Sequence, residues 1–311
     1  MNKIAFVFPG QGSQSVGMLD ALSAYPLVTE CVQQAGQILN SDLLKTINEG
    51  PKELLNQTQW TQPALLAVSV GVFKTLQAHS ELQINLMAGH SLGEYSALVC
   101  AGSISFEEAV KLVYKRGLYM QDAVPVGTGS MAAILGLDAV VVEEVCQQVQ
   151  QSSDSTVSPA NYNSPGQIVI AGTVAAVEAA GLLCKDAGAK KVMPLAVSVP
   201  SHCELMRPAA DRFIEDLKAI NFQPPKYPVL HNVDVQSHSN ADEIQSLLEQ
   251  QLYAPVRWSQ IMEAMQQAGV NKVVECGPGK VLSGLFKRFD RNMQTLPLLN
   301  NKGIESFKNE L

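Results

Sequence analysis

Short apolar runs alternate with amphipathic segments in the first 124 residues of the chain. The run I-A-F-V-F has the length of a buried strand, and Pro9 and Gly10 directly after it favour a turn. By the same criteria we expect strands at 4–8 and 84–88, and helices at about 20–40, 63–79 and 106–122. Strands that alternate with helices predict a parallel sheet of the α/β class.

Two of the expected helices carry start signals. Thr61 followed by Pro63 indicates that a helix begins there, because proline is favoured in the first helical turn. The stretch S-F-E-E at 105–108 has the spacing of a capping box, in which a serine and a glutamate bond each other's backbone amides.

The pattern changes between residues 125 and 199. A strand at 131–137 and a helix at 138–151 are followed by two strands around the turn Ser164-Pro165-Gly166, a helix at 174–187 and a strand at 190–198. The order β-α-β-β-α-β is the signature of a ferredoxin-like fold. We therefore predict that residues 125–199 form a small domain inserted into a larger one.

The α/β pattern resumes at Pro200. We expect helices at about 202–220, 241–252, 257–268 and 280–289, and strands at 227–232, 272–276 and 295–299. Residues 1–124 and 200–311 are therefore predicted to form one hydrolase-like, parallel-sheet core domain, interrupted by the small one.

Composition narrows the class of protein. The 311 residues are 46% hydrophobic and 16% charged, an ordinary balance for a soluble globular chain, and the net charge is −7. No basic excess suggests nucleic acid, and no apolar stretch reaches the roughly 18 residues of a membrane span. The amino terminus lacks the apolar length of a signal peptide, so we expect a cytoplasmic protein.

The cysteines do not predict a metal site. Structural zinc sites need closely spaced cysteine and histidine pairs, and no C-x-x-C and no histidine cluster is present. Reduced thiols are the simplest interpretation of the six cysteines, at positions 31, 100, 146, 184, 203 and 276.

Candidate chemistry begins at G-H-S-L-G, residues 89–93, which lies between an expected strand and a helical segment. A serine in such a turn is exposed at the carboxyl edge of the sheet and can act as a nucleophile. Ser91 is our candidate, and the backbone amide of Leu92 would donate to an oxyanion from the start of the helix. The alternative is a tight glycine turn with an incidental serine.

The loop G-Q-G-S-Q-S at 10–15 follows the first strand. It lacks the third glycine of a dinucleotide-binding loop, because Ser15 occupies that position. We interpret it as a segment whose backbone approaches the site, with the amide of Gln11 as a second oxyanion donor.

The base that activates a serine is expected to be one of five histidines, and His202 is the best placed. S-H-C-E at 201–204 has capping-box spacing, which predicts that His202 lies in a first helical turn, where the positive helix end disfavours imidazolium. The group that orients the ring stays open at this stage: Glu204, Asp211, Asp234 or a backbone carbonyl.

Several motifs that follow one another along the chain together resemble those of a known protein family. They are F-P-G-Q-G-S-Q (8–14), G-H-S-L-G-E-Y-S-A-L (89–98), Arg116, N-Y-N-S-P-G-Q (161–167), P-S-H (200–202), Q-L-Y-x-P-V (251–256) and G-P-G (277–279). Together they resemble the malonyl-CoA:acyl carrier protein transacylases of bacterial type II fatty acid synthesis, through nearly the whole chain. That family's fold also has a ferredoxin-like insertion.

The resemblance implies roles for the matching positions. Ser91 is implied as the nucleophile, His202 as the base, and Gln11 and Leu92 as the oxyanion hole. The carbonyl of Gln251 would then orient the histidine in a Ser–His dyad. Two further residues have implied roles toward the substrate: Arg116 would bind the malonyl carboxylate and Asn161 would line the cleft between the domains.

Two positions depart from the family pattern. Cys276 stands before G-P-G where an aliphatic residue is expected, and we interpret it as a packing residue. His231 stands before Asn232 where asparagine is common, which leaves the hydrogen bonding there open.

The function implied is ping-pong transfer of malonyl from malonyl-CoA to the phosphopantetheine thiol of acyl carrier protein. Coenzyme A and acyl carrier protein are the expected partners, and no cofactor is expected. Both partners are anionic, which makes Lys190, Lys191, Lys287, Arg288 and Arg291 candidate contacts. An acyl-CoA thioesterase or other serine hydrolase would share Ser91 and His202 but has no need for Arg116, and a silent carrier-binding module would need no intact dyad.

Overall fold

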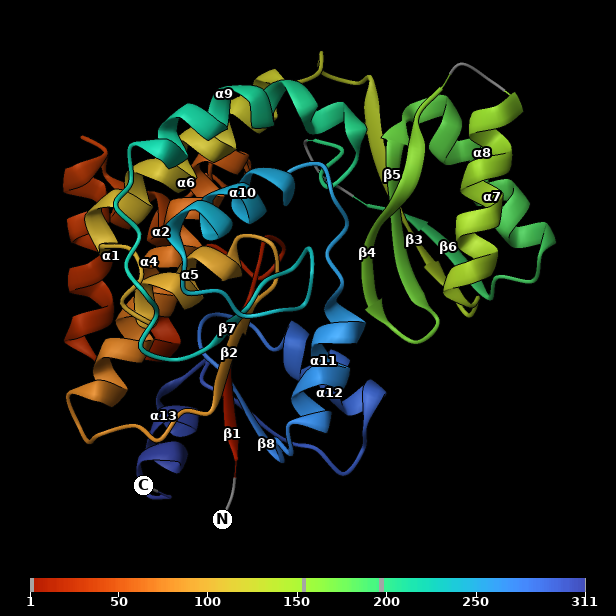
Figure 1. Cartoon of the computed structure of the whole chain (residues 1–311). Helices are drawn as coiled ribbons and strands as arrows, with labels where there is room; N and C mark the ends of the chain where they lie inside the picture. Colours follow the sequence, from red (N-terminus) through yellow and green to blue (C-terminus); the bar gives the residue numbers. More distant parts are fainter. Residues whose placement is uncertain (1–2, 153–154, 196–198, 311) are drawn as a thin grey trace.

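The computed structural model describes residues 3–152, 155–195 and 199–310. Within these ranges five strands form the central sheet, and all are parallel to their neighbours (Figure 1). In spatial order they are β7 (Val229–Leu230), β2 (Leu86–Gly89), β1 (Ile4–Phe8), β8 (Lys272–Glu275) and β9 (Gln294–Pro297). The predicted parallel α/β sheet is confirmed, although only two of the residues expected at 227–232 form a strand.

Side chains of β1 alternate between two hydrophobic layers. Phe6 and Phe8 pack against a helical layer on one face, whereas Ala5 and Val7 pack against the layer on the other. The first layer contains α1 (Pro26–Ile38), α4 (Thr58–Gln77), α5 (Gly93–Cys100), α6 (Phe106–Asp122), α9 (Arg207–Lys218), α10 (Ala241–Gln250) and α13 (Asn301–Lys308). The second contains α11 (Trp258–Gln267) and α12 (Val281–Phe289), seen on the opposite side of the sheet in Figure 1.

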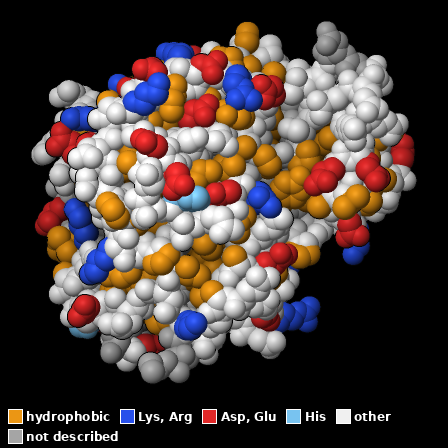
Figure 2. All heavy atoms as spheres, viewed as in Figure 1, with side chains coloured by type: hydrophobic (Ala, Val, Ile, Leu, Met, Phe, Trp, Pro, Cys, Tyr) orange, Lys and Arg blue, Asp and Glu red, His pale blue; other side chains and the backbone are white. Residues whose placement is uncertain are grey.

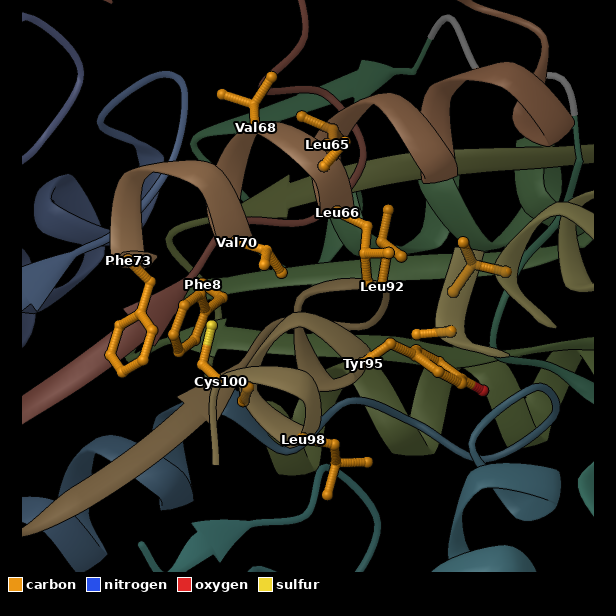
Figure 3. Packing of buried hydrophobic residues seen from close by; sticks show 14 of the residues in the cluster. Phe8, Leu65, Leu66, Val68, Val70, Phe73, Leu92, Tyr95, Leu98 and Cys100 are labelled. Atoms are coloured by element: carbon orange, nitrogen blue, oxygen red, sulfur yellow. The ribbon is translucent and has the colours of Figure 1, made fainter. Parts of the chain in front are cut away.

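Helix α4 is the centre of the first layer. Most of its side chains are buried, and Figure 3 shows Phe73 of α4 beside Phe8 of β1, with ring centroids 6.3 Å apart. The helix begins at Thr58, so the prediction that it begins near Pro63 is wrong. A proline in the second turn removes one backbone hydrogen bond, and the buried apolar positions that follow it stabilise the helix despite that loss.

A second, antiparallel sheet forms the small subdomain, as predicted. Its spatial order is β4 (Val157–Ser164), β5 (Gln167–Thr173), β3 (Gly129–Leu135) and β6 (Lys191–Pro194). Helices α7 (Ala139–Ser152) and α8 (Val174–Asp186) pack on one face, and the other face turns toward the large sheet (Figure 1). Residues 196–198 of the strand expected at 190–198 lie outside the described residues. The domain limits at 124/125 and 199/200 stay a prediction.

The helix expected at 202–220 is divided. A short 3-10 turn, η2 (Glu204–Met206), comes first, and α9 begins at Arg207 with a proline in its first turn.

The capping box of α6 forms as predicted, with Ser105 and Glu108 bonding each other's amides. The helix expected at 20–40 is divided as well, into a 3-10 turn, η1 (Asp20–Leu22), and the shorter helix α1. The remaining short helices were not predicted: α2 (Leu43–Glu49), α3 (Lys52–Leu55) and α13. No helix in the described ranges is long and apolar enough to cross a membrane.

Two helical glycines allow a matched test of packing in the first layer. A Cβ at Gly71 of α4 would lie 2.7 Å from the Cα of Val28 in α1, whereas a Cβ at Gly284 of α12 would have no atom within 4 Å. Gly71→Ala should lower the free energy of unfolding by about 1–3 kcal/mol, because the two backbones must separate. Gly284→Ala should raise it by up to about 1 kcal/mol, because alanine favours the helix. Urea unfolding measures both, and equal effects would contradict this close packing of α1 on α4.

Candidate active site

Ser91 lies in a sharp turn between β2 and α5, with a positive φ of 51°. The two glycines of G-H-S-L-G make this turn possible. A Cβ at Gly89 would lie 1.8 Å from the carbonyl carbon of Gly93, and one at Gly93 would lie 2.0 Å from the carbonyl oxygen of Phe8. The turn therefore has the close packing of a nucleophile elbow and holds the serine at the carboxyl end of the parallel sheet.

His202 contacts the Ser91 hydroxyl. Its Nε2 lies 2.8 Å from Ser91 Oγ, and its Nδ1 lies 2.7 Å from the carbonyl oxygen of Gln251. Because a carbonyl only accepts, Nδ1 carries the proton and Nε2 is free to accept from the serine. This tautomer is the one that a general base requires.

The acidic candidates for orienting His202 lie elsewhere. Glu204 pairs with Arg207, Asp234 hydrogen-bonds to His238, and Asp211 is exposed. Of the groups left open by the sequence, the backbone carbonyl of Gln251 is therefore the one in contact with the ring.

The prediction that His202 lies in a first helical turn is wrong. The residue has a positive φ of 62° and precedes the N-cap of η2. Burial, followed by the positive charge of Arg116, lowers the pKa of His202 to about 3. The imidazole is therefore neutral, as the sequence led us to expect, but for a different physical reason.

Arg116 extends from α6 to the serine and is 1% exposed. Its Nη2 donates to Ser91 Oγ at 3.2 Å and to Gln251 Oε1 at 3.0 Å, and Nη1 donates to Gln62 Oε1 at 2.9 Å. All three acceptors are neutral. Within the described residues no carboxylate forms an ion pair with this guanidinium, and Nε has no hydrogen-bond partner. Burial lowers the pKa of Arg116.

Two backbone amides face the same space. Leu92 caps the start of α5, and Gln11 follows β1 in a loop that approaches the elbow so closely that a Cβ at Gly10 would lie 2.4 Å from the carbonyl oxygen of His90. Among the described residues neither the Leu92 nor the Gln11 amide has a backbone acceptor, and both residues line the cleft. Both amides are thus available to a ligand.

The cleft has a volume of about 290 Å³ and lies between the large sheet and the small subdomain. Asn161 of β4 is 7% exposed and lines it together with Asn163. The Oδ1 atom of Asn163 lies 2.8 Å from Nε2 of His90, which joins the small subdomain to the elbow. Figure 2 shows hydrophobic side chains gathered on the part of the small subdomain that lies next to the large domain.

Sequence reasoning missed three polar residues that support the site. Gln62 of α4 bonds Arg116, the side chain of Asn232 accepts from the amide of Ser91 at 2.7 Å, and Glu94 of α5 accepts from Nδ1 of His231 at 2.7 Å. Glu94 stands in the motif itself, but its partners come from positions more than 130 residues away, which no local pattern indicates. His231, whose bonding was left open, is buried and bound to this carboxylate.

Metal ligands are not grouped in the described part of the chain, where no three histidine, cysteine, aspartate or glutamate side chains converge.

All six cysteines are free and buried, and burial raises the pKa of Cys276. A buried, protonated thiol is consistent with the packing role predicted for that residue.

The chain is similar to known proteins over most of its length. A family model described as acyl transferase domain matches residues 5–296. The malonyl CoA-acyl carrier protein transacylase of Escherichia coli strain K12 is 53% identical over 289 residues, covering 93% of this chain and 93% of that protein. The solved structure of the malonyl CoA-acyl carrier protein transacylase from Coxiella burnetii has a TM-score of 0.97 and 48% identity, covering 100% of this chain and 98% of that one. A malonyl-transacylase solved in complex with its type II PKS acyl-carrier protein has a TM-score of 0.97 and 48% identity, with 100% of both chains covered.

The two environments of His202 and His238 predict different titrations. His202 should stay neutral across the range in which an ordinary histidine, with a pKa of about 6.5, takes up a proton. Burial alone would lower the pKa of His238, but its contacts with Asp234 and Glu243 raise it. Imidazole NMR signals, assigned with His202→Gln and His238→Gln, measure both. A His202 signal that titrates with the His238 signal would contradict the assignment of a buried, neutral base.

Proposed function

Because the chain belongs to the malonyl CoA-acyl carrier protein transacylase family, we propose that it transfers malonyl from malonyl-CoA to the phosphopantetheine thiol of an acyl carrier protein. The observation that supports this most directly is the buried Arg116, whose guanidinium lies 3.2 Å from the Ser91 hydroxyl. Among the described residues its hydrogen-bond acceptors are all neutral. Such a group is suited to bind an acyl substrate that ends in a carboxylate.

The first half-reaction acylates the serine. His202 takes the proton of Ser91 as its oxygen attacks the thioester carbonyl of malonyl-CoA, and the amides of Gln11 and Leu92 donate to the oxyanion that forms. The carbon–sulfur bond then breaks, and coenzyme A leaves as a thiol with the proton that His202 held. The products are malonyl-Ser91 and free coenzyme A.

The second half-reaction reverses these steps with a different thiol. The phosphopantetheine thiol of the carrier protein gives its proton to His202 and attacks the malonyl ester. The bond to Ser91 Oγ breaks, the serine recovers its proton, and malonyl leaves on the carrier. The chemistry uses side chains and backbone amides of this chain, malonyl-CoA is a substrate, and no cofactor takes part.

Arg116 supplies the selectivity in this proposal. A malonyl carboxylate can form a bidentate pair with the guanidinium, whereas an acetyl group would leave a buried charge beside a methyl. Asn161 lines the cleft that the acyl chain and pantetheine must enter. A thioesterase or other serine hydrolase could use Ser91 and His202 equally well, but it would have no use for this guanidinium.

The proposed partners are coenzyme A and an acyl carrier protein, in fatty acid synthesis in the cytoplasm. A structural relative has been solved with its acyl-carrier protein, which supports a protein partner of this class. Both partners are anionic and this chain has a net charge of −7, so local basic side chains must offset repulsion. Arg288 of α12 is placed for this, because it hydrogen-bonds to Gln167 at the rim of the cleft.

The proposed intermediate predicts a stable mass change. Malonyl-CoA should add one malonyl group to the intact protein, mapped to the peptide that contains G-H-S-L-G, with release of one equivalent of coenzyme A. Carrier protein should then remove the adduct, and Ser91→Ala should never form it. Mass spectrometry of the intact protein measures each step. Continuous release of coenzyme A without carrier protein would instead identify a hydrolase, and an adduct that survives Ser91→Ala would refute the nucleophile.

The proposed dyad predicts that acylation requires His202 but none of the three carboxylates that the sequence offered for orienting its ring. His202→Ala should slow acylation by roughly 10²- to 10⁴-fold, the usual contribution of a general base. Glu204→Ala, Asp211→Ala and Asp234→Ala are the matched controls and should acylate at close to the wild-type rate. Stopped-flow release of coenzyme A measures all four. A control as slow as His202→Ala, in a protein that still folds, would establish a triad in place of the dyad.

A further inference from the structure

A buried carboxylate next to the catalytic groups has no role in the reaction as proposed. Glu94 lies in the first turn of α5 and is 1% exposed. Its Oε2 accepts from the amide of Asn232 at 2.9 Å and from the side-chain amide of Gln251 at 2.8 Å, and its Oε1 accepts from Nδ1 of His231 at 2.7 Å. The two amides can only donate, and an ionised Glu94 accepts from both of them and from the Nδ1–H tautomer of His231.

The side chain of Gln251 separates this carboxylate from the guanidinium of Arg116. Its Nε2 donates to Glu94, and its Oε1 accepts from Arg116 at 3.0 Å. Opposite charges at the two ends of one amide strengthen both of its hydrogen bonds, because the amide is polarised in the same sense by each. The amide therefore links the two charged groups, which do not form an ion pair with each other.

Gln251 also contacts the other two catalytic groups. Its backbone carbonyl accepts from His202, and its Nε2 lies 3.2 Å from the carbonyl oxygen of Ser91. Asn232 adds a second link, since its amide donates to Glu94 while its side chain accepts from the amide of Ser91 and donates to the carbonyl of Gly89. All of these links meet at one carboxylate.

We propose that Glu94 is a positioning residue that acts through Gln251 and Asn232 to hold Ser91, His202 and Arg116 in one geometry. His231 holds the carboxylate from its other side. Its ring is fully buried and its Nε2 has no hydrogen-bond partner among the described residues, so the bond to Glu94 is the polar contact that fixes the ring. This inference rests on the proposed function, because its effect is read in acyl transfer.

A double-mutant cycle tests the link through Gln251. Gln251→Ala removes the amide but keeps the backbone carbonyl that accepts from His202. Glu94→Ala and Gln251→Ala should each lower kcat for malonyl transfer by about 10²-fold, the loss expected from a small displacement of reacting groups. The double variant should be no more than about twofold slower than the slower single variant, because both changes break the same link.

A conservative variant separates geometry from charge. Glu94→Gln can keep all three contacts, because its oxygen accepts from Asn232 and Gln251 while His231 changes tautomer and accepts from the new amide. Its kcat should stay within about tenfold of the wild-type value, well above that of Glu94→Ala. If Glu94→Ala does not fold, Glu94→Met replaces it in the cycle, since it fills similar space without accepting a hydrogen bond.

A second buried carboxylate is the control for lost stability. Glu275 is fully buried and accepts from the amides of Leu282 and Ser283 at the start of α12. Glu275→Ala should lower the unfolding temperature but change kcat by no more than about twofold. Any of three results would show that the positioning role is wrong. Glu275→Ala could lose as much kcat as Glu94→Ala, the losses in the double-mutant cycle could be additive, or Glu94→Gln could be as slow as Glu94→Ala. Failure of the wild-type protein to form malonyl-Ser91 would instead refute the proposed function.

Discussion

A buried positive charge that no carboxylate of the described residues contacts directly is the constraint on which this site depends. Arg116 is desolvated, and its guanidinium is held by the oxygens of Gln62, Gln251 and Ser91, all of them neutral. Burying a charge in this way costs free energy that the fold must offset with other interactions. The cost is consistent with a site that receives its counter-charge from the substrate.

The fold meets this constraint by bringing distant segments to one edge of the parallel sheet. The elbow after β2 exposes Ser91, the loop after β1 supplies the Gln11 amide, α6 supplies Arg116, and the end of α10 places Gln251 between the charges. The small subdomain closes the other side with Asn161. The strands and helices that precede or carry these groups are packed in apolar layers, so the polar site is supported by a hydrophobic core.

The local sequence pattern predicted the architecture well. It did not predict the hydrogen-bond network that surrounds Glu94 behind the site. The elbow, the parallel sheet, the βαββαβ subdomain and the capping box at Ser105 all follow from neighbouring residues, and all are present. The start of α4 and the conformation of His202 were wrong, because tertiary packing overrides the usual signals of proline and of capping-box spacing there. Glu94 was missed because its partners are brought to it only by folding.

The central claim is that the Arg116 guanidinium binds the carboxylate of the acyl group. The ratio of malonyl to acetyl transfer in wild type, Arg116→Lys and Arg116→Ala tests it most directly. Removing one member of a desolvated charge pair costs about 2–5 kcal/mol, so Arg116→Ala should lower malonyl transfer roughly 30- to 5,000-fold while acetyl transfer falls little or rises. Lysine should restore the ratio only in part, since it cannot reproduce the planar fork. Equal losses for both acyl groups would contradict the account and leave Arg116 as a residue that supports the fold or binds coenzyme A.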